Sequence, residues 1–306
     1  MTPYKMFEHT VKHPFFLYIL LWAILAAWSG PTLAGSLEAT VPPDVLADYT
    51  AFLDGRDPLA VTDYSGLYAR RDVIEVVLFL QALSRGGFGD LPGLKAIPSY
   101  GRSLLAVSSG AAVSTATSVW KRDVFESQDI LSSPPMIRQG EFEAGLYTAP
   151  GNRKALHAAT AGNVRRLTGV CNRQWTPDWE VVRGLRPRKL CPAPDWRVMV
   201  RMVAEQRADF LLAPFQPTPG LRLEAFGSVL VPIPGLKVRF PGSRVFAVSR
   251  RHPQGERCHA SLVRGLWAMR REGVIEKAYT QCGFFNPRTR DWLAMDWANP
   301  EPEDSR

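Results

Sequence analysis

The stretch WRVMVRMVAEQRADFLLA, residues 196–213, carries the pattern that decides the fold. Four apolar residues recur in it at the spacing of one helix face: Val198, Met199, Met202 and Val203. This periodicity predicts an amphipathic helix over residues 196–206, and the short apolar run at 208–213 predicts a buried strand. Helix, turn and strand in this order are typical of α/β folds, in which helices cover a largely parallel sheet.

The same order occurs earlier in the chain. Residues 102–107 predict a helix that ends at Gly110, and residues 111–118 predict a strand of small and β-branched residues. Two similar α/β halves joined by extended segments predict a two-lobed protein with a hinge. Because the unit is common in α/β proteins, a single large sheet is the alternative.

Further elements are predicted from the same patterns. The helices are expected at residues 44–53, 71–83, 178–183, 258–271 and 274–281. The strands are expected at residues 59–62, 94–98, 136–148, 166–170, 189–191, 227–233 and 243–248.

The N-terminal 34 residues are typical of a secretory signal peptide. Lys5 and Lys12 form a basic start, residues 15–28 are apolar, and Thr32-Leu33-Ala34 supplies the small-residue exit. The apolar run is shorter than the roughly 20 residues of a membrane-spanning helix. A cleaved signal peptide and a periplasmic protein are therefore expected, and an uncleaved anchor is the alternative.

The charge and the cysteines restrict the function classes. The net charge is +8, and it becomes +7 when Lys5, Glu8 and Lys12 are removed with the signal peptide. No basic run suggests a nucleic-acid arm, so the excess fits an anionic ligand, an acidic envelope surface or solubility alone. The even set of Cys171, Cys191, Cys258 and Cys282 favours disulfides in an exported chain, with three pairings open. No CxxC is present, and a metal site or other cofactor is not expected.

Catalytic motifs give little support for an enzyme. The sequence contains no GxSxG, HExxH, P-loop or GxGxxG. The histidines of the mature part, His157, His252 and His259, are scattered, which speaks against a Ser-His or Cys-His pair. No catalytic residues are assigned.

Short segments in order along residues 59–292 resemble the extracellular solute-binding proteins of family 3. They are FLQAL (79–83), VSSG (107–110), SSPP (132–135), RAD (207–209), RVFAVS (244–249) and GLWAM (265–269) with the following GVI, AY and Gly283. The resemblance implies the type II periplasmic-binding-protein fold, in which two α/β lobes close on a small solute. Lobe one would comprise residues 58–146 and 238–297, and lobe two residues 147–237. Residues 35–57 would lead in, residues 298–306 would form a disordered tail, and strands near 142–147 and 236–246 would cross between the lobes.

The resemblance also implies where a ligand would bind, because ligands of open α/β sheets lie at the carboxyl ends of strands. One wall would carry Asp63, Tyr64, Ser65, Thr117, Ser118, Arg122, Ser132 and Ser133. The other would carry Asn172, Arg173, Trp175 and, near the hinge, Gln216. Two disulfides, Cys171–Cys191 and Cys258–Cys282, follow from the same implied fold.

One departure from the family bears on the ligand. Amino-acid-binding members carry an Arg shortly after the small-residue strand, whereas the nearest basic residues here, Lys121 and Arg122, are displaced. A small polar solute, with an anionic group as one option, is therefore expected, taken up by a monomeric protein that serves an ABC-type permease. A sensor or an interaction module without a solute is the alternative.

Overall fold

The computed structural model describes Met1 and residues 37–295. The predicted signal peptide, apart from Met1, and the predicted tail lie outside these residues. Residues 37–295 belong to one compact unit of the chain. Within residues 37–295, no helix combines the length and the apolar character needed to cross a membrane.

The first lobe is built on a five-stranded sheet in the order β2-β1-β3-β13-β5. Its strands are β1 (Glu38–Val41), β2 (Gly93–Ala96), β3 (Ser114–Thr115), β5 (Ile130–Ser132) and β13 (Ala247–Ser249). β1 pairs in parallel with β2 and β3, whereas β13 runs antiparallel to β3 and β5. A short ladder joins β4 (Val119–Trp120) to β12 (Arg244–Val245).

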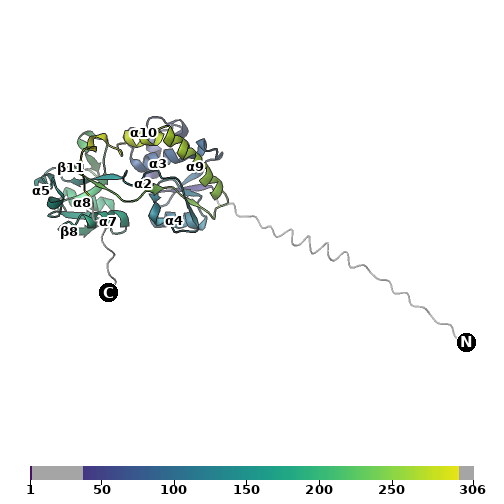
Figure 1. The fold of residues 1–306 in the computed structure, drawn as a ribbon, viewed down its shortest axis with the longest axis horizontal. Coiled ribbons are helices and arrows are strands. Elements are labelled where there is room, and N and C mark those ends of the chain that lie inside the picture. The colour runs from purple at the N-terminus through teal and green to yellow at the C-terminus, as the bar shows by residue number, and fades with distance from the viewer. Residues whose placement is uncertain (2–36, 296–306) are drawn as a thin grey trace. The chain divides into compact units, whose positions relative to one another are not determined.

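Five helices cover this sheet: α2 (Pro43–Leu53), α3 (Arg71–Arg85), α4 (Tyr100–Ser109), α9 (Gly255–Arg271) and α10 (Val274–Gln281). Helix α3 is buried around its whole circumference, and every residue from 73 to 83 is buried, Glu75 and Gln81 included. It packs closely against α9, because a Cβ at Gly265 would lie 1.9 Å from the carbonyl oxygen of Ala82. In Figure 1, α3, α9 and α10 lie together.

The second lobe combines two sheets. β10 (Leu223–Ala225), β11 (Ser228–Arg239), β6 (Glu143–Thr148) and β9 (Leu211–Pro214) pair antiparallel in that order, while β7 (Thr168–Cys171) and β8 (Lys189–Pro192) pair in parallel. Its helices are α5 (Arg153–Leu156), α6 (Ala161–Val164), α7 (Thr176–Gly184) and α8 (Trp196–Ala204). Short 3-10 helices, η1 (Pro58–Ala60), η2 (Lys121–Asp123), η3 (Pro219–Leu221) and η4 (Pro287–Thr289), complete the described elements.

Strands β6 and β11 carry the chain between the lobes. Their antiparallel register shifts between Pro232 and Lys237, and β14 (Leu293–Met295) adds to β11 in parallel. The buried Lys237 donates to the carbonyl oxygens of Thr289 and Arg290 and pairs with Glu143 on β6 at 3.0 Å. The predicted two-lobed α/β architecture is confirmed, with parallel and antiparallel pairs mixed in each lobe.

Two predicted strands are wrong, and the strand predicted over residues 111–118 is reduced to β3. Residues 59–62 were expected to form the first strand, but η1 occupies Pro58–Ala60, and the first strand, β1, lies between β2 and β3 in the predicted lead-in. Residues 136–148 do not form one strand, because the chain turns at Arg138–Glu141 and Gly140 has a φ of +83°. Only β6 remains of it. The main predicted helices are confirmed.

Both predicted disulfides are wrong, since all four cysteines are free. In the β7–β8 ladder Cys191 faces Val170, and Cys171 faces Pro192. Side chains alternate across a sheet, so the two cysteines project from opposite faces. Counting from Gly273, Cys258 is 15 residues back along α9 and Cys282 is nine residues onward. At about 1.5 Å per helical residue, this mismatch of about 9 Å exceeds the reach of a disulfide even for antiparallel helices.

Candidate functional site

The buried carboxylate of Glu75 lies next to the segment that follows β3. Ser118 lies between β3 and β4, and its backbone N–H and Oγ donate to the two carboxylate oxygens of Glu75 at 2.8 and 2.7 Å. Glu75 belongs to α3 and is fully buried. A charge removed from water in this way requires several hydrogen bonds to remain stable.

Arg71 and Tyr279 supply the remaining partners of this carboxylate. Arg71 lies one helical turn before Glu75, and its Nη1 is 2.7 Å from Glu75 Oε1. The hydroxyl of Tyr279, from α10, donates to the same oxygen at 3.2 Å. Burial, together with the Glu75 charge, raises the pKa of Tyr279 well above its usual value, so the phenol stays protonated and can donate.

Arg244 approaches Ser118 from the opposite side. It pairs with Trp120 across the β4–β12 ladder, its Nε donates to Ser118 Oγ at 2.9 Å, and its Nη2 donates to the Ser118 carbonyl oxygen. Burial and the neighbouring Arg71 lower the pKa of Arg244, although an arginine remains charged at neutral pH. We call Arg71, Glu75, Ser118 and Arg244 the buried charge cluster.

A layer of aromatic rings supports this cluster. The guanidinium of Arg244 lies 4.8 Å from the ring centroid of Trp120, and that of Arg71 lies 5.6 Å from Phe142. Trp120 and Phe142 both contact Phe240, at 5.6 and 4.7 Å between centroids. Phe142 directly precedes β6 and Phe240 directly follows β11, so the rings fix the two guanidinium groups where the chain crosses between lobes.

Lobe two contributes helix α7 to the same region. Glu180 pairs with Arg122 of lobe one at 2.7 Å. Burial raises the pKa of Asp178 to about 6, and the charges of Arg244, Arg71 and Arg122 oppose this shift, which places the carboxyl near all three. Asp178 forms no ion pair with a described residue.

The two buried arginines keep donors in reserve. Within residues 37–295, nothing accepts a hydrogen bond from Arg71 Nε or Nη2 or from Arg244 Nη1. A guanidinium has five N–H donors in a fixed fork, suited to a carboxylate or phosphate. The arrangement can therefore bind a small anionic group near Asp178 of lobe two.

The structure brings few of the sequence-predicted site residues to this cluster. Ser118 is its central member, Thr117 is its half-buried neighbour, and Arg122 reaches α7. Asp63, Tyr64 and Ser65 form a separate network: Ser65 donates to Asp63, and the Tyr64 hydroxyl donates to Gln81 at 2.8 Å.

The other predicted residues also have local partners. Ser133 Oγ accepts from Phe246 N at 2.9 Å, and the carbonyl oxygen of Ser132 lies 3.0 Å from His259 Nε2, so both serines hold β5 in place. Three residues engage lobe-two groups: Asn172 donates to the Pro194 carbonyl oxygen, Arg173 lies over Trp179, and Trp175 lies 6.4 Å from Trp196. Gln216 donates to the carbonyl oxygen of Pro214.

Sequence reasoning missed Arg71, Glu75, Asp178 and Arg244. Glu75 stands inside the apolar helix sequence VIEVVLFL, a signal for a buried charge that needs a nearby partner, and Arg71 has the i,i+4 spacing to supply it. No sequence pattern marks Arg244, because it lies next to Ser118 only through the pairing of β4 with β12.

One catalytic motif does occur, because Ser118 and Lys121 have SxxK spacing. The geometry does not resemble a nucleophile with its base. Ser118 Oγ is bonded to Glu75 and Arg244, while Lys121 Nζ lies 5.7 Å from the ring of Phe125. The described residues hold no group of three or more His, Cys, Asp or Glu side chains that could bind a metal ion.

Comparisons with solved structures identify the fold. The chain is similar to an amino acid ABC transporter substrate-binding protein, AbpA, from Streptococcus pneumoniae, with 14% identity, a TM-score of 0.52, and coverage of 84% of this chain and 95% of that one. It is similar to the periplasmic VFT2 domain of Bordetella pertussis BvgS, with 15% identity, a TM-score of 0.53, and coverage of 84% and 96%. It is also similar to substrate-binding domain 2 of Lactococcus lactis GlnP, with 13% identity, a TM-score of 0.50, and coverage of 83% of this chain and 97% of that one.

No protein-family model and no curated protein sequence matches the chain. The fold is that of the two-lobed type II periplasmic binding proteins, as the resemblance to family 3 solute-binding proteins implied. At these identities the likeness shows the fold alone. What the site binds depends on its own residues.

Proposed function

We propose that this chain is a solute-binding protein that captures a small polar solute with an anionic group between its two lobes. Arg71 and Arg244 would hold the anionic group. The observation that carries the proposal is the pair of guanidinium groups, that of Arg244 buried and that of Arg71 largely buried, with donors that no described residue uses. The fold supports a binding role, since its solved relatives include substrate-binding proteins of transporters.

The two arginines are held ready for a ligand. Each guanidinium lies against aromatic rings, and each is tied to Ser118 or Glu75 by hydrogen bonds. A carboxylate or phosphate would therefore bind without ordering long side chains, which is a large part of the cost of binding. Arg71 and Arg244 would take the place of the arginine that amino-acid-binding members of the family carry, a role for which Lys121 and Arg122 are displaced.

Asp178 would contact the opposite end of the solute. It belongs to α7 in lobe two, whereas both arginines belong to lobe one. A solute with an anionic group and a cationic or hydrogen-bond-donating group would link the lobes, so it would favour their closed arrangement. One solved relative is described as bound to L-arginine, so amino acids are the first class to test, followed by small dicarboxylates.

The rest of the proposal follows the sequence. The predicted signal peptide would deliver the protein to the periplasm, and an ABC-type permease or a sensor would be its partner. Thr117, Ser118 and Arg122 remain in the proposed site, while the other predicted residues have the local partners described above.

Ligand-induced thermal stabilisation tests the proposal. The purified protein is screened against the standard amino acids and against succinate and glutarate, and native mass spectrometry identifies any solute that co-purifies. For the best ligand, Arg244→Lys should weaken binding about tenfold or more, because one ammonium group cannot hold Ser118 at two atoms and still offer a further nitrogen to the ligand. Arg271→Lys, an exposed change on α9, is the control.

Two results would overturn the proposed site. The first is a ligand whose affinity is unchanged in Arg244→Lys. The second is an affinity that is unchanged both in Arg71→Lys, which tests lobe one, and in Asp178→Asn, which tests lobe two.

A further inference from the structure

Five basic side chains gather at one end of lobe two. Arg165 and Arg166 precede β7, while Arg186, Arg188 and Lys189 lie at the start of β8. The parallel pairing of Thr168 with Lys189 and the hydrogen bond from Arg188 N to Leu167 O at 2.9 Å bring the two segments together. We call these five residues the basic end. These residues belong to two separate segments of the sequence, 165–166 and 186–189, which the pairing of β7 with β8 brings together.

The charges of the basic end are not neutralised by the described residues. All five side chains are exposed, and none forms an ion pair within residues 37–295. The adjacent carboxylate, Asp209, already accepts from Thr168 N at 2.7 Å, from Asn152 and from Lys154. These contacts lower the pKa of Asp209. Its carboxylate is therefore charged at neutral pH, and Lys154 already pairs with it.

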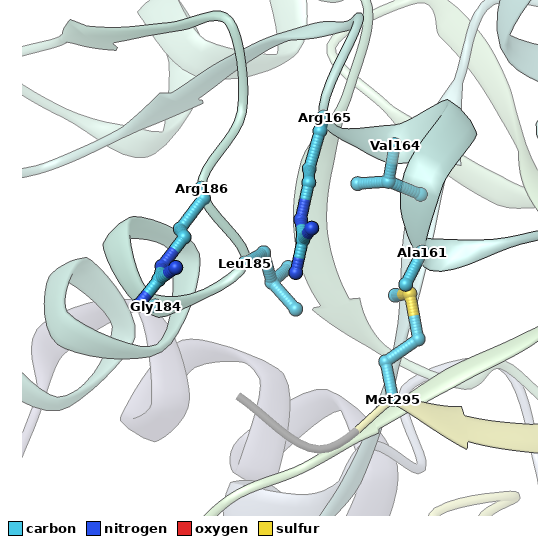
Figure 2. Close-up of a pocket in the computed structure, with 7 residues that line it drawn as sticks. All are labelled: Ala161, Val164, Arg165, Gly184, Leu185, Arg186 and Met295. Carbon is cyan, nitrogen blue, oxygen red and sulfur yellow. The ribbon is translucent and has the colours of Figure 1, made fainter. Parts of the chain in front are cut away.

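A small pocket opens between two of these arginines. It has a volume of about 110 Å³ and is lined by Ala161, Val164, Arg165, Gly184, Leu185, Arg186 and Met295. Figure 2 shows Arg165 extending into the pocket beside Leu185, with Met295 and Ala161 on the other side. The pocket thus combines guanidinium donors with an apolar lining.

The basic end is separate from the proposed solute site. It lies at the N-terminal ends of β7 and β8, whereas β7 leads at its C-terminal end through Asn172 to α7, which carries Asp178. In a parallel pair these ends are on opposite edges. A partner on the basic end would therefore leave the solute site accessible.

We infer that the basic end binds an anionic phospholipid surface, with a headgroup phosphate in the pocket between Arg165 and Arg186. The guanidinium fork matches phosphate oxygens, and the apolar lining suits the carbon atoms next to a lipid phosphate. Several Lys and Arg residues near an anionic bilayer attract a protein to it. The apolar run at residues 15–28 predicts export, which would place this chain beside a membrane.

Vesicle co-sedimentation of the full chain tests the inference. The vesicles contain phosphatidylcholine alone or phosphatidylcholine with one third phosphatidylglycerol. The chain should bind the anionic vesicles more strongly, and the excess should disappear in high salt. Arg165→Glu with Arg186→Glu should reduce the excess about tenfold or more. Because every variant keeps the N-terminal segment, its contribution cancels.

A matched control separates the basic end from net charge. Arg102→Glu with Arg271→Glu makes the same charge change on lobe one, where both residues are exposed and without an ion pair to a described residue. This double variant should keep its binding. A milder pair, Arg165→Gln with Arg186→Gly, guards against misfolding, since Arg186 has a φ of +54° that glycine adopts without strain.

Three outcomes would overturn the inference. One is equal binding by the wild type and the Arg165→Glu/Arg186→Glu variant, and another is an equal loss in the lobe-one control. The third is retention of the chain by immobilised poly-glutamate without binding to anionic vesicles, which would assign the surface to an acidic polypeptide. Competition by millimolar inorganic phosphate together with vesicle binding would support a phosphate contact in the pocket.

Discussion

Arg244 and Trp120 are cross-strand partners whose side chains also stack, with the guanidinium 4.8 Å from the ring centroid. The same guanidinium holds Ser118, and Ser118 holds Glu75. The short ladder between β4 and β12 therefore positions the guanidinium of Arg244 and, through Ser118, its link to the carboxylate of Glu75. The predictions below test this arrangement and its link to lobe two.

Glu75→Gln should destabilise the protein strongly. It leaves Arg71 buried without its ion-pair partner, and breaking a buried pair in this way costs about 3–5 kcal/mol. Urea unfolding measures the loss. Glu205→Gln is a matched control, because Glu205 and Arg201 form an i,i+4 pair of the same 2.7 Å length on α8, but exposed. Its unfolding curve should overlay that of the wild type. Equal losses in both variants would contradict the assigned role of burial.

Asp178→Asn should stabilise the protein in a pH-dependent way. Burial raises the pKa of Asp178 from 3.8 to about 6 in the folded state. Between these values the folded state binds the proton more tightly, so this carboxyl lowers the free energy of unfolding as pH rises from about 4 to 6. The variant should match the wild type near pH 4 and exceed it by about 1–3 kcal/mol at pH 7.

Urea unfolding at several pH values checks this difference. Glu224→Gln, an exposed change on β10, should follow the wild type throughout. A constant offset between Asp178→Asn and the wild type from pH 4 to 7 would show that Asp178 is not the titrating group.

The four cysteines should behave as thiols. Burial raises the pKa of Cys171, Cys258 and Cys282 to about 12, so these thiols should resist iodoacetamide in the folded protein at pH 8. The less buried Cys191 should react first. After unfolding without a reductant, mass spectrometry should find four adducts. Only two adducts, rising to four after reduction, would establish a disulfide instead.

Reversing one charge should loosen the contact between the lobes. Glu180→Arg places a cation against Arg122, whose pair with Glu180 spans the lobes at 2.7 Å. Because both side chains are partly exposed, the free energy of unfolding should change by less than about 1 kcal/mol. The radius of gyration from small-angle scattering should increase, and Arg122→Glu in the same chain should restore it. A radius that never changes would exclude this pair as a closing contact.

The fold was largely predictable because its signals are local. The periodicity of residues 71–83 and 196–206 appears in α3 and α8. The first strand was missed because residues 38–41 alternate polar and apolar over only four positions, which is too short a pattern to predict a strand. A short central strand depends on its neighbours in the sheet rather than on its own sequence.

The site was less predictable because it depends on long-range pairing. Ser118 could be found as a polar residue after a strand, but Arg244 is 126 positions away and meets it only through β4 and β12. The disulfides failed for a related reason. Spacing brings Cys171 and Cys191 to neighbouring strands, but their register places them on opposite faces.

The contacts of Lys237 connect residues 289–295 to the crossing strand β11, so this segment is part of the hinge. This side chain bonds to the carbonyl oxygens of Thr289 and Arg290 from within β11, and β14 lies alongside the same strand. Bending β11 must therefore strain or break these bonds. A fluorophore placed at residue 293, on β14, would consequently report strain in the crossing strand rather than the position of either lobe.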